Sequence, residues 1–246
     1  MITLKSPQEI EMIRRAGQIL KSIIQKLKSF VVPDITTQEI DNYVAQLIAQ
    51  QGATAAFLGY KGFPANICVS VNEEVVHGIP SERLIRRGDI VSVDLGVAYN
   101  GYFADSAVTL PIGNIKPSVK KLIQITRESL FRGIKQARSG KHLGDISHSI
   151  QSHVEANGFS VVRQFVGHGI GTNLQEEPEV PNFGKPHEGI ALKEGMVLAI
   201  EPMVNMGSWE VEILDNGWTV VTKDRLASAH FEHTVAITKN GPEVLT

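Results

Sequence analysis

Apolar residues recur at helical spacing in four stretches of the chain. The first begins at Ser6-Pro7-Gln8-Glu9, which combines an N-cap, a proline at the first helical position and a capping-box glutamate. The second begins at Thr36-Thr37-Gln38-Glu39, which repeats the capping signal, and stops at Gly52. Two further stretches span about 118–137 and about 143–156. The pattern predicts four amphipathic helices.

Alternation with a period of two predicts a β-hairpin centred on Asn100-Gly101. Asn-Gly between two strand-like runs is the strongest short hairpin signal, because both central residues of a type I′ turn need positive φ. Counting outward from this turn pairs Gly96 with Asp105. Asp94 and Asp105 should then share one face as diagonal neighbours, about 7–8 Å apart, with Gly96 leaving the space between them open. Two buried carboxylates repel each other, so we expect a cation between them.

The second half of the chain repeats this order. Gly88-Asp-Ile-Val-Ser-Val-Asp94 aligns with Gly195-Met-Val-Leu-Ala-Ile-Glu201, and Asp105-Ser-Ala-Val-Thr resembles Glu232-His-Thr-Val-Ala. We interpret the pattern as an internal duplication, with halves of about 1–115 and 116–246. Two such halves, packed about a pseudo-two-fold axis, would bring two carboxylate pairs to one centre.

Three local predictions complete the outline. The stretch between the two repeated acids of the second half contains Asn216-Gly217, so we expect an added hairpin there. The run from Ser160 to Val166 is predicted as a strand. An irregular loop is expected at three later prolines, Pro178, Pro181 and Pro186.

Composition limits the class of protein. With 246 residues, of which 42% are hydrophobic, we expect a single compact domain over 1–246. The 24 basic and 26 acidic residues give no basic surplus, which argues against nucleic acid or a membrane as the main partner. Cys68 is the only cysteine, which excludes an internal disulfide and fits a reducing compartment. No apolar run marks a signal or spanning segment, so we expect a cytoplasmic protein. We also expect it to be a monomer.

His168 lies in Val-Gly-His168-Gly-Ile-Gly. Glycines on both sides let the backbone approach closely and the ring project into a site, which suits a neutral nitrogen ligand. Taken alone, a hydrogen-bonded structural histidine is the commoner interpretation. His230 and His233 flank Glu232 and are expected either to support the site or to face the sheet, whereas four others look like surface or helix residues: His142, His148, His153 and His187.

Together these motifs closely resemble the type I methionine aminopeptidases in their short bacterial form. The resemblance spans the chain and rests on the order Asp94, Asp105, His168, Ala-Ile-Glu201-Pro and His-Phe-Glu232-His, with Ser70-Val-Asn-Glu-Glu-Val-Val-His77-Gly-Ile-Pro. It implies an α+β pita-bread fold, in which duplicated α-β halves surround a central antiparallel sheet that carries a dinuclear metal site. It also implies removal of the N-terminal methionine from nascent polypeptides and peptides, with preference for a small second residue. A transient ribosome contact is compatible with this role.

The resemblance implies a ligand set for two divalent ions. Asp105 and Glu232 would bridge the ions, Asp94 would chelate one, and His168 and Glu201 would bind the other. Oxygen-rich ligation with one histidine suits Co, Mn, Fe(II) or Zn, and the sequence does not choose among them. Such a pair lowers the pKa of a shared water toward about 7 and polarises the scissile carbonyl. Glu201 would also carry a proton from water to the leaving amine.

Two further positions bear on catalysis. The resemblance makes His77 a catalytic histidine that contacts the scissile amide, although alone it reads as a loop histidine before Gly78-Ile-Pro80. Gln175 occupies the place of the family's second active-site histidine, which donates to the substrate carbonyl. An amide can donate but cannot carry a charge near pH 7. Loss of such a donor costs about 10²–10³ in rate, so we expect this partial replacement to reduce activity less, or to alter substrate choice.

The resemblance also assigns a methionine pocket, which an apolar, aromatic and sulfur-containing lining would suit. For the aromatic residues at 57, 60 and 63, ordinary core packing is the alternative. The assigned residues are Phe57, Tyr60, Phe63, Cys68, His77, Leu174, Gln175 and Trp218.

Two other functions stay open. One is an X-prolyl aminopeptidase-like hydrolase of the same fold, although such enzymes usually carry a long additional N-terminal domain. The other is a non-catalytic pita-bread module that binds peptides or proteins, a hypothesis that Gln175 motivates. Five intact ligand positions argue against it, because an unused cluster of buried acids costs stability.

Overall fold

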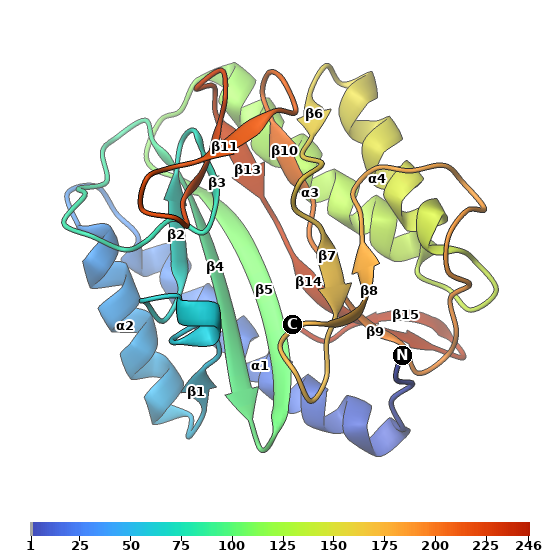
Figure 1. Cartoon of the computed structure of the whole chain (residues 1–246). Coiled ribbons are helices and arrows are strands. Elements are labelled where there is room, and N and C mark those ends of the chain that lie inside the picture. Colours follow the sequence, from blue (N-terminus) through green and yellow to red (C-terminus); the bar gives the residue numbers. More distant parts are fainter. Residues whose placement is uncertain (1) are drawn as a thin grey trace.

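Four long helices pack against the strands, two from each half of the chain (Figure 1). The structure, a computed structural model, describes residues 2–246. The helices are α1 (Pro7–Phe30), α2 (Thr37–Gln50), α3 (Pro117–Gln136) and α4 (Leu143–Ala156). All four predicted helices are therefore confirmed.

The starts of the first two helices follow from their capping residues. Ser6 caps α1 and Thr36 caps α2, and each forms a reciprocal capping box with the glutamate three residues later. These bonds satisfy backbone N–H groups that have no partner inside the helix. Gly52 follows α2 with a φ of 66°, a conformation that glycine adopts without strain.

The first sheet carries the predicted hairpin. It contains β1 (Thr54–Ala55), β2 (Cys68–Val71), β4 (Ile90–Tyr99) and β5 (Tyr102–Pro111), with β5 on one edge of β4 and the two short strands along the other. Gly96 pairs with Asp105, and Tyr99 pairs with Tyr102. Asn100 and Gly101 have φ values of 49° and 82°. The predicted register and turn are confirmed.

The second sheet carries the repeated motif. Its order is β15-β14-β9-β7-β8, formed by β7 (Gly167–Gly169), β8 (Glu176–Val180), β9 (Val197–Ile200), β14 (His233–Thr238) and β15 (Gly241–Val244). The antiparallel pair β9–β14 corresponds to β4–β5, and Glu201 and Glu232 lie at its end. Pro178 lies inside β8, so the predicted loop is wrong there. Because β8 is an edge strand, a proline without an N–H is tolerated in it.

The central sheet of the predicted fold is formed by these two sheets, which meet at β5 and β14. The Thr234 hydroxyl donates to the Asp105 carbonyl at 2.8 Å and accepts from the Asp105 N–H at 2.9 Å. The Glu232 N–H donates to the Ala107 carbonyl at 3.0 Å. These hydrogen bonds fix one acid of each half beside the other.

Two small sheets close the fold. One contains β6 (Ser160–Val161), β10 (Met203–Asn205) and β13 (Ser228–His230); the other contains β3 (Glu74–Val76), β11 (Val211–Ile213) and β12 (Val220–Thr222). The β11–β12 hairpin confirms the predicted insertion. The predicted strand over 160–166 is wrong beyond Val161, because β10 starts only at Met203 and offers one further bond, from the Val162 N–H to the Met203 carbonyl at 3.0 Å.

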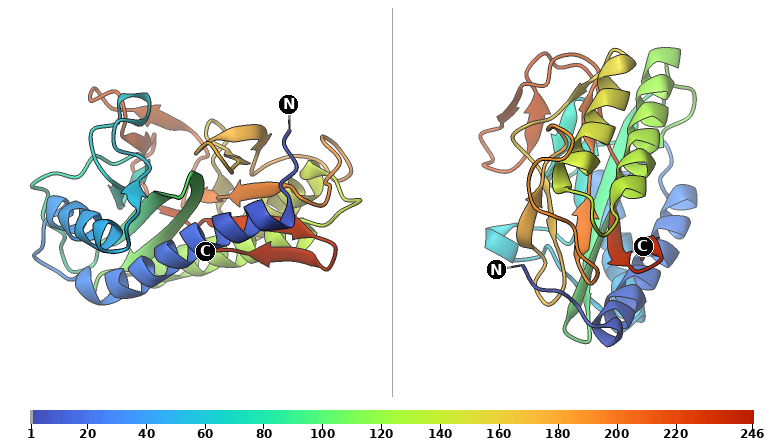
Figure 2. Two further views of the ribbon diagram at one scale, coloured as in Figure 1. Left: turned by 90° about the horizontal axis from the view of Figure 1, so that it is seen from below. Right: turned by 90° about the vertical axis from the view of Figure 1, so that its right-hand side faces the viewer.

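The helices and the site lie on opposite sides of the strands. Helices α1 and α3 run along one side, whereas the β11–β12 hairpin and the 3₁₀ turn η1 (Tyr60–Gly62) lie on the other (Figure 2). Two large clusters of buried apolar side chains, each drawn mainly from one half of the chain, fill the space beneath the helices. Among residues 2–246, no helix has the length and apolar character needed to span a bilayer.

Candidate metal centre and substrate pocket

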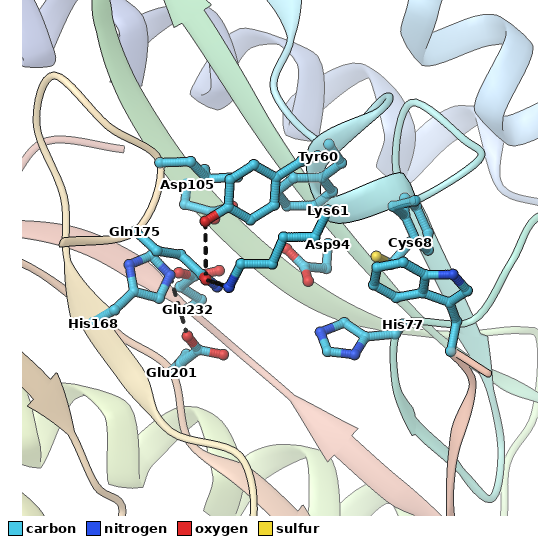
Figure 3. Close-up of a pocket in the computed structure, with 14 residues that line it drawn as sticks. Tyr60, Lys61, Cys68, His77, Asp94, Asp105, His168, Gln175, Glu201 and Glu232 are labelled. Carbon is cyan, nitrogen blue, oxygen red and sulfur yellow. Dashed lines mark hydrogen bonds and ion pairs between the residues drawn. The ribbon is translucent and has the colours of Figure 1, made fainter. Parts of the chain in front are cut away.

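All five predicted ligands line one cavity of about 140 Å³. Asp94 lies on β4 and Asp105 on β5, whereas His168 lies on β7. Glu201 follows β9 directly, and Glu232 precedes β14 directly. Their side chains point toward a common centre (Figure 3). Strand alternation and the duplicated motif therefore place these groups together as predicted.

His168 is oriented as a neutral ligand. Its Nδ1 atom lies 2.9 Å from the Gly169 carbonyl, and this bond makes Nδ1 the protonated nitrogen. Nε2 is thereby left with its lone pair, 3.7 Å from Glu201 Oε1. Burial lowers the pKa of the imidazole, which keeps the ring neutral at pH 7. The flanking glycines permit this placement, since a Cβ on Gly167 would lie 2.3 Å from the Ala199 carbonyl oxygen.

Asp105 and Glu232 are buried, Asp94 and Glu201 are partly buried, and the four carboxyl groups repel one another. Burial, with repulsion from neighbouring acids, raises the pKa of Asp94, Glu201 and Glu232 well above the ordinary range. Burial raises the pKa of Asp105 from 3.8 to about 7. The cost of ionising these groups would fall sharply if cations lay between them.

Two observations show that metal ions fit this site. Among residues 2–246, Asp94 Oδ1 and Glu232 Oε1 are buried side-chain oxygens without a hydrogen-bond partner. One ligand atom from each of Asp105, His168 and Glu232 lies within 4.8 Å of the others. Buried polar atoms in a folded protein are normally paired, so unpaired carboxylate oxygens in the same cavity as a neutral imidazole indicate a place for divalent ions. Burial raises the pKa of the nearby Cys68 thiol, which disfavours the thiolate.

His77 faces the same cavity from the other side. It follows β3 with a φ of 59°, which is uncommon for a residue other than glycine and is typical of functional positions. Its ring lies edge-on to Phe165 and Trp218, with centroid distances of 5.5 and 6.3 Å. Burial, with a smaller effect from Lys61, lowers the pKa of His77 to about 4. A neutral ring at pH 7 can donate one hydrogen bond to a substrate.

The predicted pocket residues form an apolar wall beside the acids. Phe63 and Trp218 meet edge to face, with ring centroids 5.1 Å apart. The sequence suggested that Gly96 leaves open space between the acids, and this prediction is wrong. A Cβ there would lie 2.8 Å from Phe57 Cε1 and 3.4 Å from Leu174 Cδ1, so the missing side chain is what lets the wall approach β4.

Gln175 lies at the rim of the cavity with two partners. Its Oε1 atom accepts from the Tyr60 hydroxyl at 3.1 Å and from Lys61 Nζ at 2.9 Å (Figure 3). Lys61 lines the cavity but was not predicted as a site residue. The only signal for it in the sequence is its position between Gly59 and Gly62, which marks a tight turn.

The other histidines divide as follows. His230 lies behind Glu201, with Nε2 3.5 Å from Glu201 Oε2, as expected of a supporting group. Burial lowers the pKa of His230 to about 3. His233 instead makes a bond of 2.8 Å to the Thr246 hydroxyl, and it does not line the cavity. His153 lies 3.1 Å from Glu128 on the helical side, and His148 is exposed.

Comparison with known proteins agrees with the site. The chain matches metallopeptidase family M24 over residues 11–239. It is 56% identical to methionine aminopeptidase from Clostridium perfringens, over 100% of this chain and 99% of that protein. It is 51% identical to methionine aminopeptidase 1 from Bacillus subtilis, with the same coverage.

Comparison with solved structures distinguishes relatives within the family from proteins that share only the fold. Methionine aminopeptidase from Thermotoga maritima superposes with a TM-score of 0.98 at 45% identity, covering 100% of this chain and 99% of that one. Prolidase from Pyrococcus furiosus is 24% identical with a TM-score of 0.80, and this chain covers 65% of it. The prolidase likeness shows the fold alone and does not favour the X-prolyl alternative. The full-length relatives are methionine aminopeptidases, so the non-catalytic alternative is not favoured either. The chain belongs to metallopeptidase family M24 and, within that family, to the methionine aminopeptidases.

Proposed function

We propose that this protein hydrolyses the N-terminal methionine from peptides and nascent chains, using two divalent metal ions held by its five predicted ligands. One observation carries the proposal. Two buried and two partly buried carboxyl groups share a cavity with one neutral imidazole and an apolar wall, and two of the carboxylate oxygens are buried without a partner among residues 2–246.

The ligands are assigned by position. Asp105 and Glu232 lie where the two halves meet, which suits them to bridge both ions. Asp94 would complete one site, and His168 with Glu201 would complete the other. When bound, two such ions polarise the scissile carbonyl and lower the pKa of water. The set suits Co, Mn, Fe(II) or Zn.

The protein's own groups supply the remaining chemistry. Burial and neighbouring acids raise the pKa of Glu201, which suits this carboxyl group to take a proton from the attacking water and pass it to the leaving amine. His77 and Gln175, on opposite sides of the cavity, would donate hydrogen bonds to the peptide bond. Because a glutamine cannot carry a charge, we expect a lower rate or a changed preference among small second residues.

The apolar wall would hold the methionine side chain. A flexible thioether packs well against aromatic rings and a buried thiol. The residues assigned to this contact are Phe57, Tyr60, Phe63, Cys68, His77, Leu174, Gln175 and Trp218.

The cellular setting is also a proposal. We place the protein in the cytoplasm as a monomer, with residues 1–246 as one catalytic domain. A single cysteine and substrates that are nascent chains support this placement. Transient ribosome contact is compatible with it, and no specific nucleic acid or membrane is expected as a partner.

Release of methionine from Met-Ala-Ser and Met-Gly-Met-Met tests the proposal. Protein reconstituted with Mn, Co or Fe(II) should release methionine, and Glu201→Ala should abolish release. Glu210→Ala is the matched control, because Glu210 is exposed and lies outside the cavity. No release from any form with confirmed bound metal would contradict the proposal.

A further inference from the structure

A lysine holds the side chain of Gln175 at the rim of the cavity. Lys61 lies in the turn η1 with a φ of 50°, between Gly59 at 80° and Gly62 at 91°. Left-handed conformations are uncommon outside glycine, and they persist where the surrounding structure requires them. This turn sends both Tyr60 and Lys61 toward Gln175, which follows β7 in the other half of the chain (Figure 3).

The contact fixes which end of the amide faces the lysine. An ammonium group has three donors and no acceptor, so the atom 2.9 Å from Lys61 Nζ must be the amide oxygen. The Tyr60 hydroxyl donates to the same oxygen at 3.1 Å. The NH₂ group is therefore the free end, and it donates no hydrogen bond to any of residues 2–246. It belongs to a residue that lines the cavity of the acids.

The backbone that carries Gln175 is anchored from behind. Its neighbour Glu176 forms an ion pair with Lys5, and only 4% of the Lys5 side chain and 11% of the Glu176 side chain are exposed. Glu176 also accepts from the Asn173 N–H at 3.0 Å. Because this loop is fixed at its base, Lys61 and Tyr60 need to restrict only the side-chain torsions of Gln175.

The charge of Lys61 adds to the effect. Hydrogen bonds from an ammonium are about twice as strong as neutral ones. An amide whose oxygen accepts such a bond is polarised, and hydrogen bonds in series strengthen one another. Lys61 and Gln175 are both exposed, so solvent screens this polarisation, and the main effect of the contact is to orient the amide.

We propose that Lys61 is a positioning residue for the reaction: it holds the amide oxygen of Gln175, so that the amide NH₂ group donates to the carbonyl oxygen of the peptide bond being hydrolysed. The inference rests on the proposed function and names a residue that acts through Gln175. It predicts an effect on the transition state more than on substrate binding, because the carbonyl oxygen gains negative charge as the reaction proceeds.

A double-mutant cycle tests this coupling. Lys61→Met keeps the length of the side chain but removes its charge and donors, and Lys61→Arg restores both. With Mn-loaded enzyme and Met-Ala-Ser, Lys61→Met should lower kcat by about 10-fold with KM within about twofold, and Lys61→Arg should recover most of the rate. In a Gln175→Ala background, Lys61→Met should have no further effect. Lys185→Met is the matched control, because 80% of that side chain is exposed.

A readout independent of activity uses metal-free protein. The side-chain NH₂ resonances of Gln175, assigned from Gln175→Ala, should shift in ¹H–¹⁵N spectra of Lys61→Met and stay in place in Lys185→Met. Unchanged resonances, an unchanged kcat, a change in KM alone, or an equal loss of kcat in the Gln175→Ala background would overturn the inference. If wild-type protein with confirmed metal releases no methionine, the proposed function fails and this inference fails with it. If the wild type is active, those outcomes overturn the inference alone.

Discussion

Residues 2–246 contain two groups of histidine and carboxylate side chains whose ligand atoms lie within 4.8 Å of one another. One consists of Asp105, His168 and Glu232, and the other of His142, Asp145 and His187. The residue types are nearly the same, but the surroundings differ. All three members of the first group are buried, whereas 77% of the His187 side chain is exposed.

The second group lies together because Asp145 forms the cap at the start of α4. Asp145 Oδ2 accepts from the His142 N–H at 2.8 Å, and Oδ1 accepts from the His187 N–H at 3.0 Å. Burial of the carboxyl group opposes ionisation, but these backbone bonds outweigh it and lower the pKa of Asp145. The carboxylate caps the N-terminal end of α4, where the helix dipole favours a negative charge and disfavours a cation.

The first group has no such internal explanation. Burial raises the pKa of both Asp105 and Glu232, and Glu232 Oε1 is buried without a partner among residues 2–246. The comparison teaches that proximity of ligand-type residues is a weak sign of a metal site. A buried carboxylate that the protein leaves unpaired is a stronger one.

The largest difference between the groups should appear in catalysis. Asp105→Asn should lower kcat/KM by more than about 100-fold, because even the outer partners of metal ligands typically contribute 10–100-fold. Asp145→Asn should leave kcat/KM within about twofold, since Asp145 lies on the cap of α4. Steady-state release of methionine at saturating Mn measures both. Equal losses of kcat/KM in the two variants would contradict the conclusion that only the first group belongs to the metal centre.

In metal-free protein, the contributions of Asp105 and Asp145 to the free energy of unfolding should change with pH in opposite directions. The pKa of Asp105 is raised to about 7, so its contribution to the free energy of unfolding is present at low pH and is lost as pH rises from about 4 to about 7. The pKa of Asp145 is lowered, so its contribution is present above pH 3.8 and is lost as pH falls below it.

Urea unfolding of wild type, Asp105→Asn and Asp145→Asn across this pH range measures each contribution, which for Asp105 includes its repulsion of Asp94, Glu201 and Glu232. Buried neutral histidines such as His77 and His230 destabilise the fold as pH falls below 6.5, but they are common to all three proteins and cancel in the differences. If the two differences changed with pH in the same direction, the assignment of opposite environments would be wrong.

The smallest effect concerns the cap alone. Asp145→Ala should cost about 1 kcal/mol of unfolding free energy, as removal of a helix cap usually does, without changing metal content. Thermal unfolding of the metal-loaded protein measures it. His148→Ala, an exposed change on the same helix, serves as a control that should stay within about 0.5 kcal/mol. A loss of bound metal in Asp145→Ala would assign this group a role beyond capping.

Much of the fold was predictable because its signals are local. Capping boxes at Ser6 and Thr36 placed two helices, and Asn100-Gly101 fixed the register of β4 and β5. The same register placed Asp94 and Asp105 on one face, and the repeated motif placed Glu201 and Glu232 in the second sheet. Alternation along strands has an exact period, so a turn of known type determines which side chains meet.

The remaining features depend on contacts between distant segments. Lys61 reaches Gln175 across 114 positions of sequence, and no local pattern links the turn at η1 to the loop after β7. Gly96 looked like open space, but the side chains of Phe57 and Leu174 occupy it. The run after Val161 has strand-like residues, yet its partner strand is too short to pair with it. In each case tertiary packing overrides local preference.

Metal content tests the central claim most directly. Equilibrium binding of Mn to chelator-treated protein, followed by electron paramagnetic resonance, should show about two ions per wild-type chain. Asp105→Asn should lose at least one ion, and Asp145→Asn should retain both. Unchanged Mn binding in Asp105→Asn, or loss of an ion in Asp145→Asn, would contradict the claim that the buried, unpaired carboxylates form the metal centre.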